Sequence, residues 1–196
     1  MRYHTDITAG SLKVGESRII ADLLLRGTDE EGWRTALYVD NVLQARSPMT
    51  AKRLRTLIRG RLETMGPGLW RLVRDGSGAV ATHACLAAAV KRSPLLGDFL
   101  DLVVREQYRL FAPALSNRLW EDYVEGCRGR DPEMPEWSAS TIARLRSSMF
   151  QILAQAGYVE STRTLRLQTV HIDREVLRYL HDRGEKYVLR CIQVAP

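Results

Sequence analysis

The chain has 196 residues, of which 45% are hydrophobic and 27% are charged. This balance is typical of a globular protein with a buried core, and it excludes wholesale disorder. The longest run without a charged residue, 76–90, is shorter than the about 20 apolar residues that a membrane-spanning helix needs, so we expect no membrane contact.

Arginine dominates the basic residues. The formal net charge is +6, and only four of the 29 basic residues are lysines. Arginine presents a planar group with several N–H donors, which suits phosphate groups and the edges of guanine bases. A GC-rich genome produces the same excess, so composition alone does not separate the two explanations. The N-terminal residues lack the apolar core of a signal peptide, and we expect a cytoplasmic protein.

Apolar residues recur at helical spacing through most of the first 130 residues. Gly27, the Ser47-Pro48 pair and the turn at 66–68 separate the first helices from one another. Thr50 is the predicted N-cap of the third helix, and the Ala-rich helix is expected to be buried. The pattern predicts helices over 16–26, 28–42, 51–61, 69–74, 79–91, 98–110 and 116–127.

The segment 131–137 holds two prolines in a short polar stretch, and we expect a domain boundary there. Residues 1–131 are then a helical domain, and residues 132–196 are a second, winged-helix-like domain. Packing of the two as one unit is also compatible with this sequence.

The pattern changes after Trp137. Ser138, Ser140 and Thr141 supply N-cap residues for a helix over 140–156, and Gly157 ends it. Residues 158–159 and 164–170 are predicted as two strands, and a last helix follows Asp173. This order of elements is typical of a winged helix-turn-helix. We therefore predict a mainly α fold, with an N-terminal helical bundle and a C-terminal winged helix-turn-helix that has a small β-hairpin.

The helix over 140–156 is the predicted recognition helix. No acidic residue occurs between 138 and 159, and the small, polar side chains opposite the core stripe allow close approach to a major groove. An ordinary amphipathic surface helix, or a winged helix that contacts only proteins, gives the same pattern. The candidate nucleic-acid-binding residues are Ser140, Thr141, Arg144, Ser147, Ser148 and Gln151 on the helix, and Arg163 and Arg166 on the hairpin.

A second basic segment, 46–74, carries eight basic residues and the single acid Glu63. Basic residues on one outer edge of the helix over 51–61 can follow a phosphate backbone; a solvated helix face is the alternative. Arg61 falls within the apolar stripe, so either Gly60 bends the helix or the Arg61 side chain extends to the surface. The candidate phosphate-binding residues here are Lys52, Arg53, Arg55 and Arg59.

The sequence contains no Walker A loop, Rossmann fingerprint, nucleophile elbow or Cys-x-x-Cys pair. We therefore expect no enzyme activity, no metal and no other cofactor, and we expect the three cysteines to be buried free thiols.

The acidic run 29–31 begins a helix and complements its dipole. Glu121, Asp122 and Glu125 make the outer face of the helix over 116–127 acidic, which suits a protein partner.

The block from Asp6 to Thr28 (DITAGSLKVGESRIIADLLLRGT), followed by Trp33 and Ala36, is similar to the BrxA family of BREX bacteriophage-exclusion systems. The similarity extends through 41–46 and the helix at Ser140-Thr141. It implies a mainly helical, non-enzymatic DNA-binding protein, with helices arranged as in the antitermination protein NusB, that acts with other BREX proteins. An older label of the family as an inner-membrane protein disagrees with the hydropathy of this chain.

The expected function is thus that of a DNA-binding accessory protein whose partner is double-stranded DNA. The likeness to NusB leaves RNA open as the ligand. A protein–protein adaptor that docks a partner through the acidic face at 121–125 is the alternative, and it predicts no saturable binding of DNA at low salt.

Overall fold

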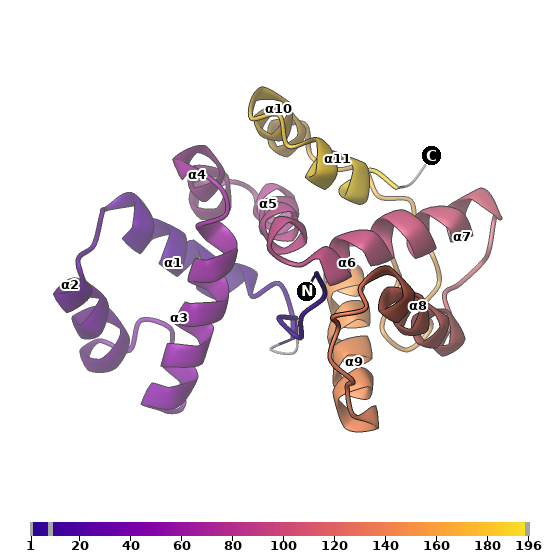
Figure 1. The fold of residues 1–196 in the computed structure, drawn as a ribbon. Helices are drawn as coiled ribbons and strands as arrows, with labels where there is room; N and C mark the ends of the chain where they lie inside the picture. Colours follow the sequence, from indigo (N-terminus) through magenta and orange to yellow (C-terminus); the bar gives the residue numbers. More distant parts are fainter. Residues whose placement is uncertain (1, 8–9, 195–196) are drawn as a thin grey trace. The chain divides into compact units, whose positions relative to one another are not determined.

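The computed structural model describes residues 2–7 and 10–194, so Thr8 and Ala9 of the N-terminal block lie outside the described residues. Within this range the secondary structure is helical, with no strand, and the prediction of a mainly α fold is confirmed (Figure 1). The elements are α1 (Val14–Leu25), α2 (Glu30–Arg34), η1 (Thr35–Val39), α3 (Pro48–Leu62), α4 (Pro67–Asp75), α5 (Gly78–Arg92), α6 (Pro94–Asp98), η2 (Phe99–Val104), α7 (Arg105–Arg109), α8 (Asn117–Arg130), α9 (Ala139–Gln155), α10 (Arg174–Asp182) and α11 (Lys186–Ile192). The two η segments are π-helical.

The chain divides into two compact units, and neither is a single stretch of sequence. Unit 1 takes the described residues of 1–11, 93–172 and 180–196, and unit 2 takes 12–92 and 173–179. Helix α10 therefore begins in unit 2 and ends in unit 1. The boundary expected at residue 131 falls inside unit 1, and a domain boundary there stays a prediction.

Unit 2 is built from α1, α3, α4 and α5, which pack against one another. Helix α5 is buried along most of its length, as its alanine-rich sequence predicts, because small side chains let neighbouring helices approach closely. The Arg18 guanidinium of α1 donates to the backbone oxygens of Arg74 and Gly76, both at 2.7 Å. These bonds satisfy carbonyl groups at the end of α4 that have no partner within the helix.

Helix α3 begins at Pro48, three residues before its predicted start. Ser47 is the N-cap, and its Oγ accepts from the backbone N–H of Thr50 at 3.2 Å. The predicted cap at Thr50 is therefore wrong, because proline fits the first turn of a helix, where its missing N–H would have no partner. Arg61, which the sequence placed within the apolar stripe, is buried, at 5% exposed.

In unit 1, α6, η2 and α7 follow one another without a break and form one continuous helix, against which other helices of the unit pack (Figure 1). Phe99 of this helix meets Trp120 and Tyr123 of α8 edge to face, with ring centroids 5.7 and 5.1 Å apart. The indole N–H of Trp120 donates to the backbone oxygen of Ile142 at 3.2 Å, so α8 and α9 are joined beside this aromatic cluster.

Asp98, at the end of α6, is a buried carboxylate that gathers three donors. It accepts from the hydroxyls of Tyr3 and Tyr187, both at 2.8 Å, and from the Arg2 guanidinium at 2.8 Å. These donors come from the N-terminal segment and from α11. Unit 1 therefore joins three distant parts of the chain at one carboxylate.

The winged helix-turn-helix with a β-hairpin is not supported, because the strands predicted over 158–159 and 164–170 do not form. Val159 and Leu167 make a single antiparallel bridge, and Arg166 makes another with Ala114. Leu165 adopts a left-handed φ of 51°, and its backbone oxygen accepts from Leu115 at 2.9 Å. The segment predicted as the second strand thus bonds partly to 113–115 and partly to 158–160, so no regular ladder of hydrogen bonds forms with either.

We predict that Asp98→Ala lowers the free energy of unfolding by about 3 kcal/mol, because the buried hydroxyl of Tyr3, the half-buried hydroxyl of Tyr187 and a guanidinium lose their acceptor. Urea denaturation followed by tryptophan fluorescence measures this change. Asp122→Ala is the control, since it breaks an exposed pair with Arg118 and should cost less than about 1 kcal/mol. Equal effects of the two substitutions would contradict a central role for Asp98.

Candidate nucleic-acid interface

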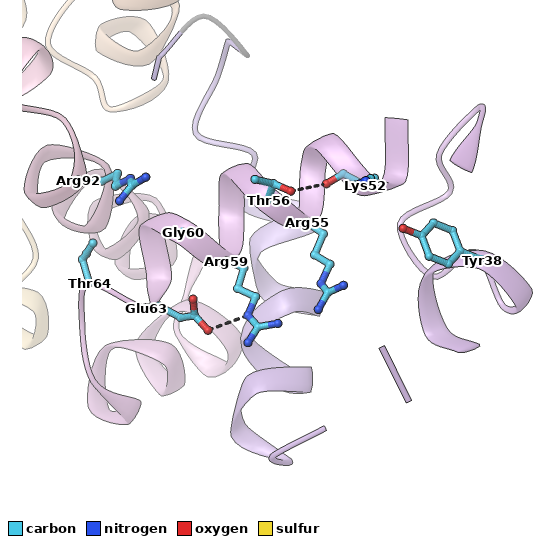
Figure 2. A pocket seen from close by; sticks show the side chains of 9 residues that line it. All are labelled: Tyr38, Lys52, Arg55, Thr56, Arg59, Gly60, Glu63, Thr64 and Arg92. Atoms are coloured by element: carbon cyan, nitrogen blue, oxygen red, sulfur yellow. Dashed lines mark hydrogen bonds and ion pairs between the residues drawn. The ribbon is translucent and has the colours of Figure 1, made fainter. Parts of the chain in front are cut away.

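A basic pocket of about 580 Å³ lies on α3 in unit 2. Three of the four candidate residues predicted on this helix, Lys52, Arg55 and Arg59, line it together. Arg53 is exposed on the same helix but does not line the pocket. The full lining, drawn in Figure 2, is Tyr38, Lys52, Arg55, Thr56, Arg59, Gly60, Glu63, Thr64 and Arg92.

Two arginines of the pocket stack on one tryptophan. The guanidinium carbons of Arg55 and Arg59 lie 5.0 and 5.3 Å from the ring centroid of Trp33. Trp33 is itself buried, at 2% exposed, so packing restricts the position of its ring. Cation–π contact with the ring holds both guanidiniums in place and leaves their remaining N–H donors for other partners.

Glu30 of α2 pairs with both of these arginines. Its carboxylate lies 2.7 Å from an Nη of Arg55 and 3.3 Å from an Nη of Arg59. Arg59 also donates from Nε to Glu63 at 2.7 Å, one turn along α3 (Figure 2). Hydrogen bonds from Arg55, and then from Arg59, hold the pKa of Glu30 below its ordinary value. The sequence did not reveal this pairing, because Glu30 and Arg55 are 25 residues apart.

The other basic side chains of this surface have no acidic partner. Lys52, Arg53 and Arg92 are exposed and form no ion pair within the part of the chain that the structure describes. Sequence reasoning missed Arg92, which ends α5; the signal was the adjacent basic pair at 91–92. These three charges remain available to an external anion.

The hydroxyl groups predicted to contact phosphate on α9, in unit 1, are largely engaged within the helix. Those of Ser140 and Thr141 each lie 3.0 Å from Oγ of the N-cap Ser138. Ser147 donates to the backbone oxygen of Ala143 at 3.0 Å. Ser148 is buried, at 5% exposed, so its hydroxyl is not on the surface where the helical pattern placed it.

The longer polar side chains of α9 are better placed. Arg144 is exposed, and Gln151 and Ser147 line a pocket of about 460 Å³ with Arg146. Arg146 was not among the predicted site residues, and its guanidinium lies 3.6 Å from Glu121 of α8.

The segment where the wing was expected carries two further arginines. Arg163 and Arg166 are exposed and make no ion pair with any described residue. Unit 1 thus also carries exposed basic side chains, although without the predicted hairpin.

No cluster of three His, Cys, Asp or Glu side chains arranged to hold a metal occurs among residues 2–7 and 10–194. All three cysteines are buried and free, and burial raises the pKa of the Cys85 thiol to about 11. None of the helices in the described range has both the length and the apolar character needed to cross a membrane.

The family model for BrxA matches residues 1–184 of the chain. This chain belongs to the BrxA family. The predicted family resemblance is thus confirmed.

Two relatives of the family cover nearly the whole chain. The BREX protein BrxA of Paramagnetospirillum magneticum (strain ATCC 700264 / AMB-1) is 56% identical over 99% of this chain and 98% of that protein. The BREX protein BrxA of Escherichia coli O9:H4 (strain HS) is 34% identical over 96% of this chain and 88% of that protein. A crystal structure of an uncharacterized protein from Magnetospirillum magneticum, 54% identical, superimposes with a TM-score of 0.93 and full coverage of both chains.

We predict that replacing Arg55 and Arg59 together by glutamine raises the pKa of Glu30 towards its ordinary value of 4.5. A lowered pKa means that these exposed ion pairs make a small contribution to stability at neutral pH, and that it is lost as the pH falls through the pKa of Glu30. A carboxyl-carbon NMR titration measures the change. Arg53→Gln, which removes a charge of α3 that does not contact Glu30, should leave the pKa lowered.

Proposed function

We propose that this BrxA protein is a non-enzymatic accessory component of a BREX phage-defence system and binds the backbone of duplex DNA. The names of its relatives support the place in a BREX system. The observation that carries the proposed binding is the basic pocket on α3, together with the adjoining basic side chains that no acid neutralises.

The charges of this surface suit an extended polyanion. Lys52 and Arg92 line the pocket together with Arg55 and Arg59, Arg53 is exposed on the same helix, and none of Lys52, Arg53 and Arg92 has an ion pair within the described residues. Contacts to phosphate release counterions from DNA, which favours binding and makes it dependent on salt. Arginines fixed by stacking lose little side-chain entropy when they bind a phosphate.

Unit 1 supplies a second, independent candidate surface. Arg163 and Arg166 suit phosphate contacts, whereas Arg144 and Gln151 of α9 have side chains long enough to reach base edges. No acidic residue between 138 and 159 opposes them. This proposal requires an exposed helix face with basic side chains, and it does not require a wing.

The adaptor alternative depends on the acidic outer face of α8. Two of its three acids already have basic partners: Asp122 pairs with Arg118 at 2.9 Å, and Glu121 pairs with Arg146 at 3.6 Å. This internal neutralisation makes α8 a weaker electrostatic partner than the surface of α3, so we favour the binding of nucleic acid. RNA in place of duplex DNA is an outcome of the experiments below.

We predict that replacing Lys52 and Arg53 together by glutamine weakens binding to all duplex sequences alike. The slope of log affinity against log salt should become shallower by about 0.9 for each phosphate group that the variant no longer neutralises. Fluorescence polarisation with a labelled duplex at several KCl concentrations measures both quantities, and competition with single strands and structured RNA identifies the preferred ligand.

The matched control replaces Arg118 and Arg128 of α8 by glutamine. It makes the same change in net charge, also at exposed positions, but on the acidic helix. If both pairs weaken binding equally, only net charge matters and α3 is not the binding surface. The absence of any saturable binding at low salt would favour the adaptor.

A separate prediction concerns α9. If a preferred sequence exists, Arg144→Gln and Gln151→Ala should each cost about 1–3 kcal/mol of binding free energy at that sequence and little elsewhere. Binding to matched and scrambled duplexes tests this, with Arg128→Gln as the charge control for Arg144→Gln. If Gln151→Ala changes nothing at any sequence, α9 does not read bases.

A further inference from the structure

Glu30 does not line the basic pocket, but it pairs with two arginines that do, and its placement is unusual. Its side chain is 75% exposed, whereas the side chains of Arg55 and Arg59, which it contacts, are 20% and 32% exposed. The carboxylate therefore covers the two guanidiniums from the solvent side. Exposed ion pairs of this kind contribute little to the stability of a protein, so fold stability does not account for this arrangement.

The two arginines need an anion beside them. They are four residues apart on α3, and both lie over the ring of Trp33, so their positive charges repel each other. Glu30 supplies a negative charge to both through Oε1, which lies 2.7 Å from Arg55 and 3.3 Å from Arg59. The same place, bounded by the same N–H donors, suits any small anion with several acceptor oxygens.

A phosphate diester satisfies these requirements. It carries one negative charge, as Glu30 does, and its oxygens match the spacing of guanidinium N–H groups. A nucleic acid gains more from the surrounding charges than the carboxylate does, because its neighbouring phosphates can also approach Lys52 and Arg92, which line the pocket with Arg55 and Arg59 and have no ion pair within the described residues. Glu63 keeps its own bond to Nε of Arg59 in either case.

We infer that Arg55 and Arg59, stacked on Trp33, form a phosphate site that Glu30 occupies in the free protein and leaves when nucleic acid binds. This inference rests on the proposed function and adds its regulation. The exchange keeps the charge beside the arginines constant, and the released carboxylate of Glu30 is hydrated by solvent. Glu30 thus competes with the ligand and lowers the affinity of the pocket.

The test compares Glu30→Gln with Glu31→Gln. Glu31 is the next residue of α2, is also exposed and makes no ion pair within the described range, so both variants change the net charge equally. In polarisation measurements with a labelled duplex, Glu30→Gln should raise the affinity about threefold more than Glu31→Gln does. If Glu30 instead holds the arginines in a binding conformation, Glu30→Gln will weaken binding, and the inference is wrong.

A double-mutant cycle shows whether the effect acts through the two arginines. With Arg55 and Arg59 both replaced by glutamine, the advantage of Glu30→Gln over Glu31→Gln should disappear. If the advantage persists in that background, Glu30 acts on another part of the surface and the inference fails.

A second measurement separates this inference from the proposed function. Inorganic pyrophosphate is titrated against the full chain while the side-chain Nε–H signals of Arg55 and Arg59 are followed by NMR. Saturation at a lower concentration in Glu30→Gln than in Glu31→Gln supports the site, even if duplex DNA does not bind and the proposed function fails. Duplex binding without any difference between the two variants, in either assay, overturns the inference alone.

Discussion

The mutual repulsion of Arg55 and Arg59 organises one side of unit 2. Both guanidiniums lie over Trp33, so the ring, a nearby anion and the pocket walls must be arranged together. Helix α2 supplies both the ring and the carboxylate within one turn, since Glu30 and Trp33 are three residues apart. This short helix therefore decides how much positive charge the surface of α3 presents to a ligand.

The sequence predicted the helices well because helical periodicity is a local property. The Ala-rich segment that becomes α5 and the apolar stripe of α3 illustrate this. The prediction of a hairpin was wrong because strand pairing depends on partners that are distant in the sequence. Alternation over 164–170 matches a strand, but the backbone of this segment bonds to 113–115 as well as to 158–160, and local periodicity contains no information about such distant partners.

The candidate site was predictable only in part. The run of basic residues located the pocket, since Lys52, Arg55 and Arg59 line it together. Charge counting within the segment 46–74 found one opposing acid, whereas the fold brings Glu30 from another helix. On α9, the helical pattern placed Ser148 at an exposed edge, and packing buries it.

The two units use paired charges differently. In unit 2 the paired charges lie at the rim of a pocket, where a ligand can compete for them. In unit 1 the carboxylate of Asp98 is enclosed by two tyrosine hydroxyls and a guanidinium, and an enclosed group of this kind fixes one arrangement of the segments around it.

The division of the chain between the units also has a consequence for synthesis on the ribosome. Most of unit 2 is the continuous stretch 12–92, so its four main helices can pack while the rest of the chain is still being made. Tyr3 is made long before its acceptor Asp98. That carboxylate in turn gains its last donor only when Tyr187 leaves the ribosome. Residues 2 and 3 therefore reach their final surroundings only after Tyr187 has been made, and unit 1 cannot be completed before that point.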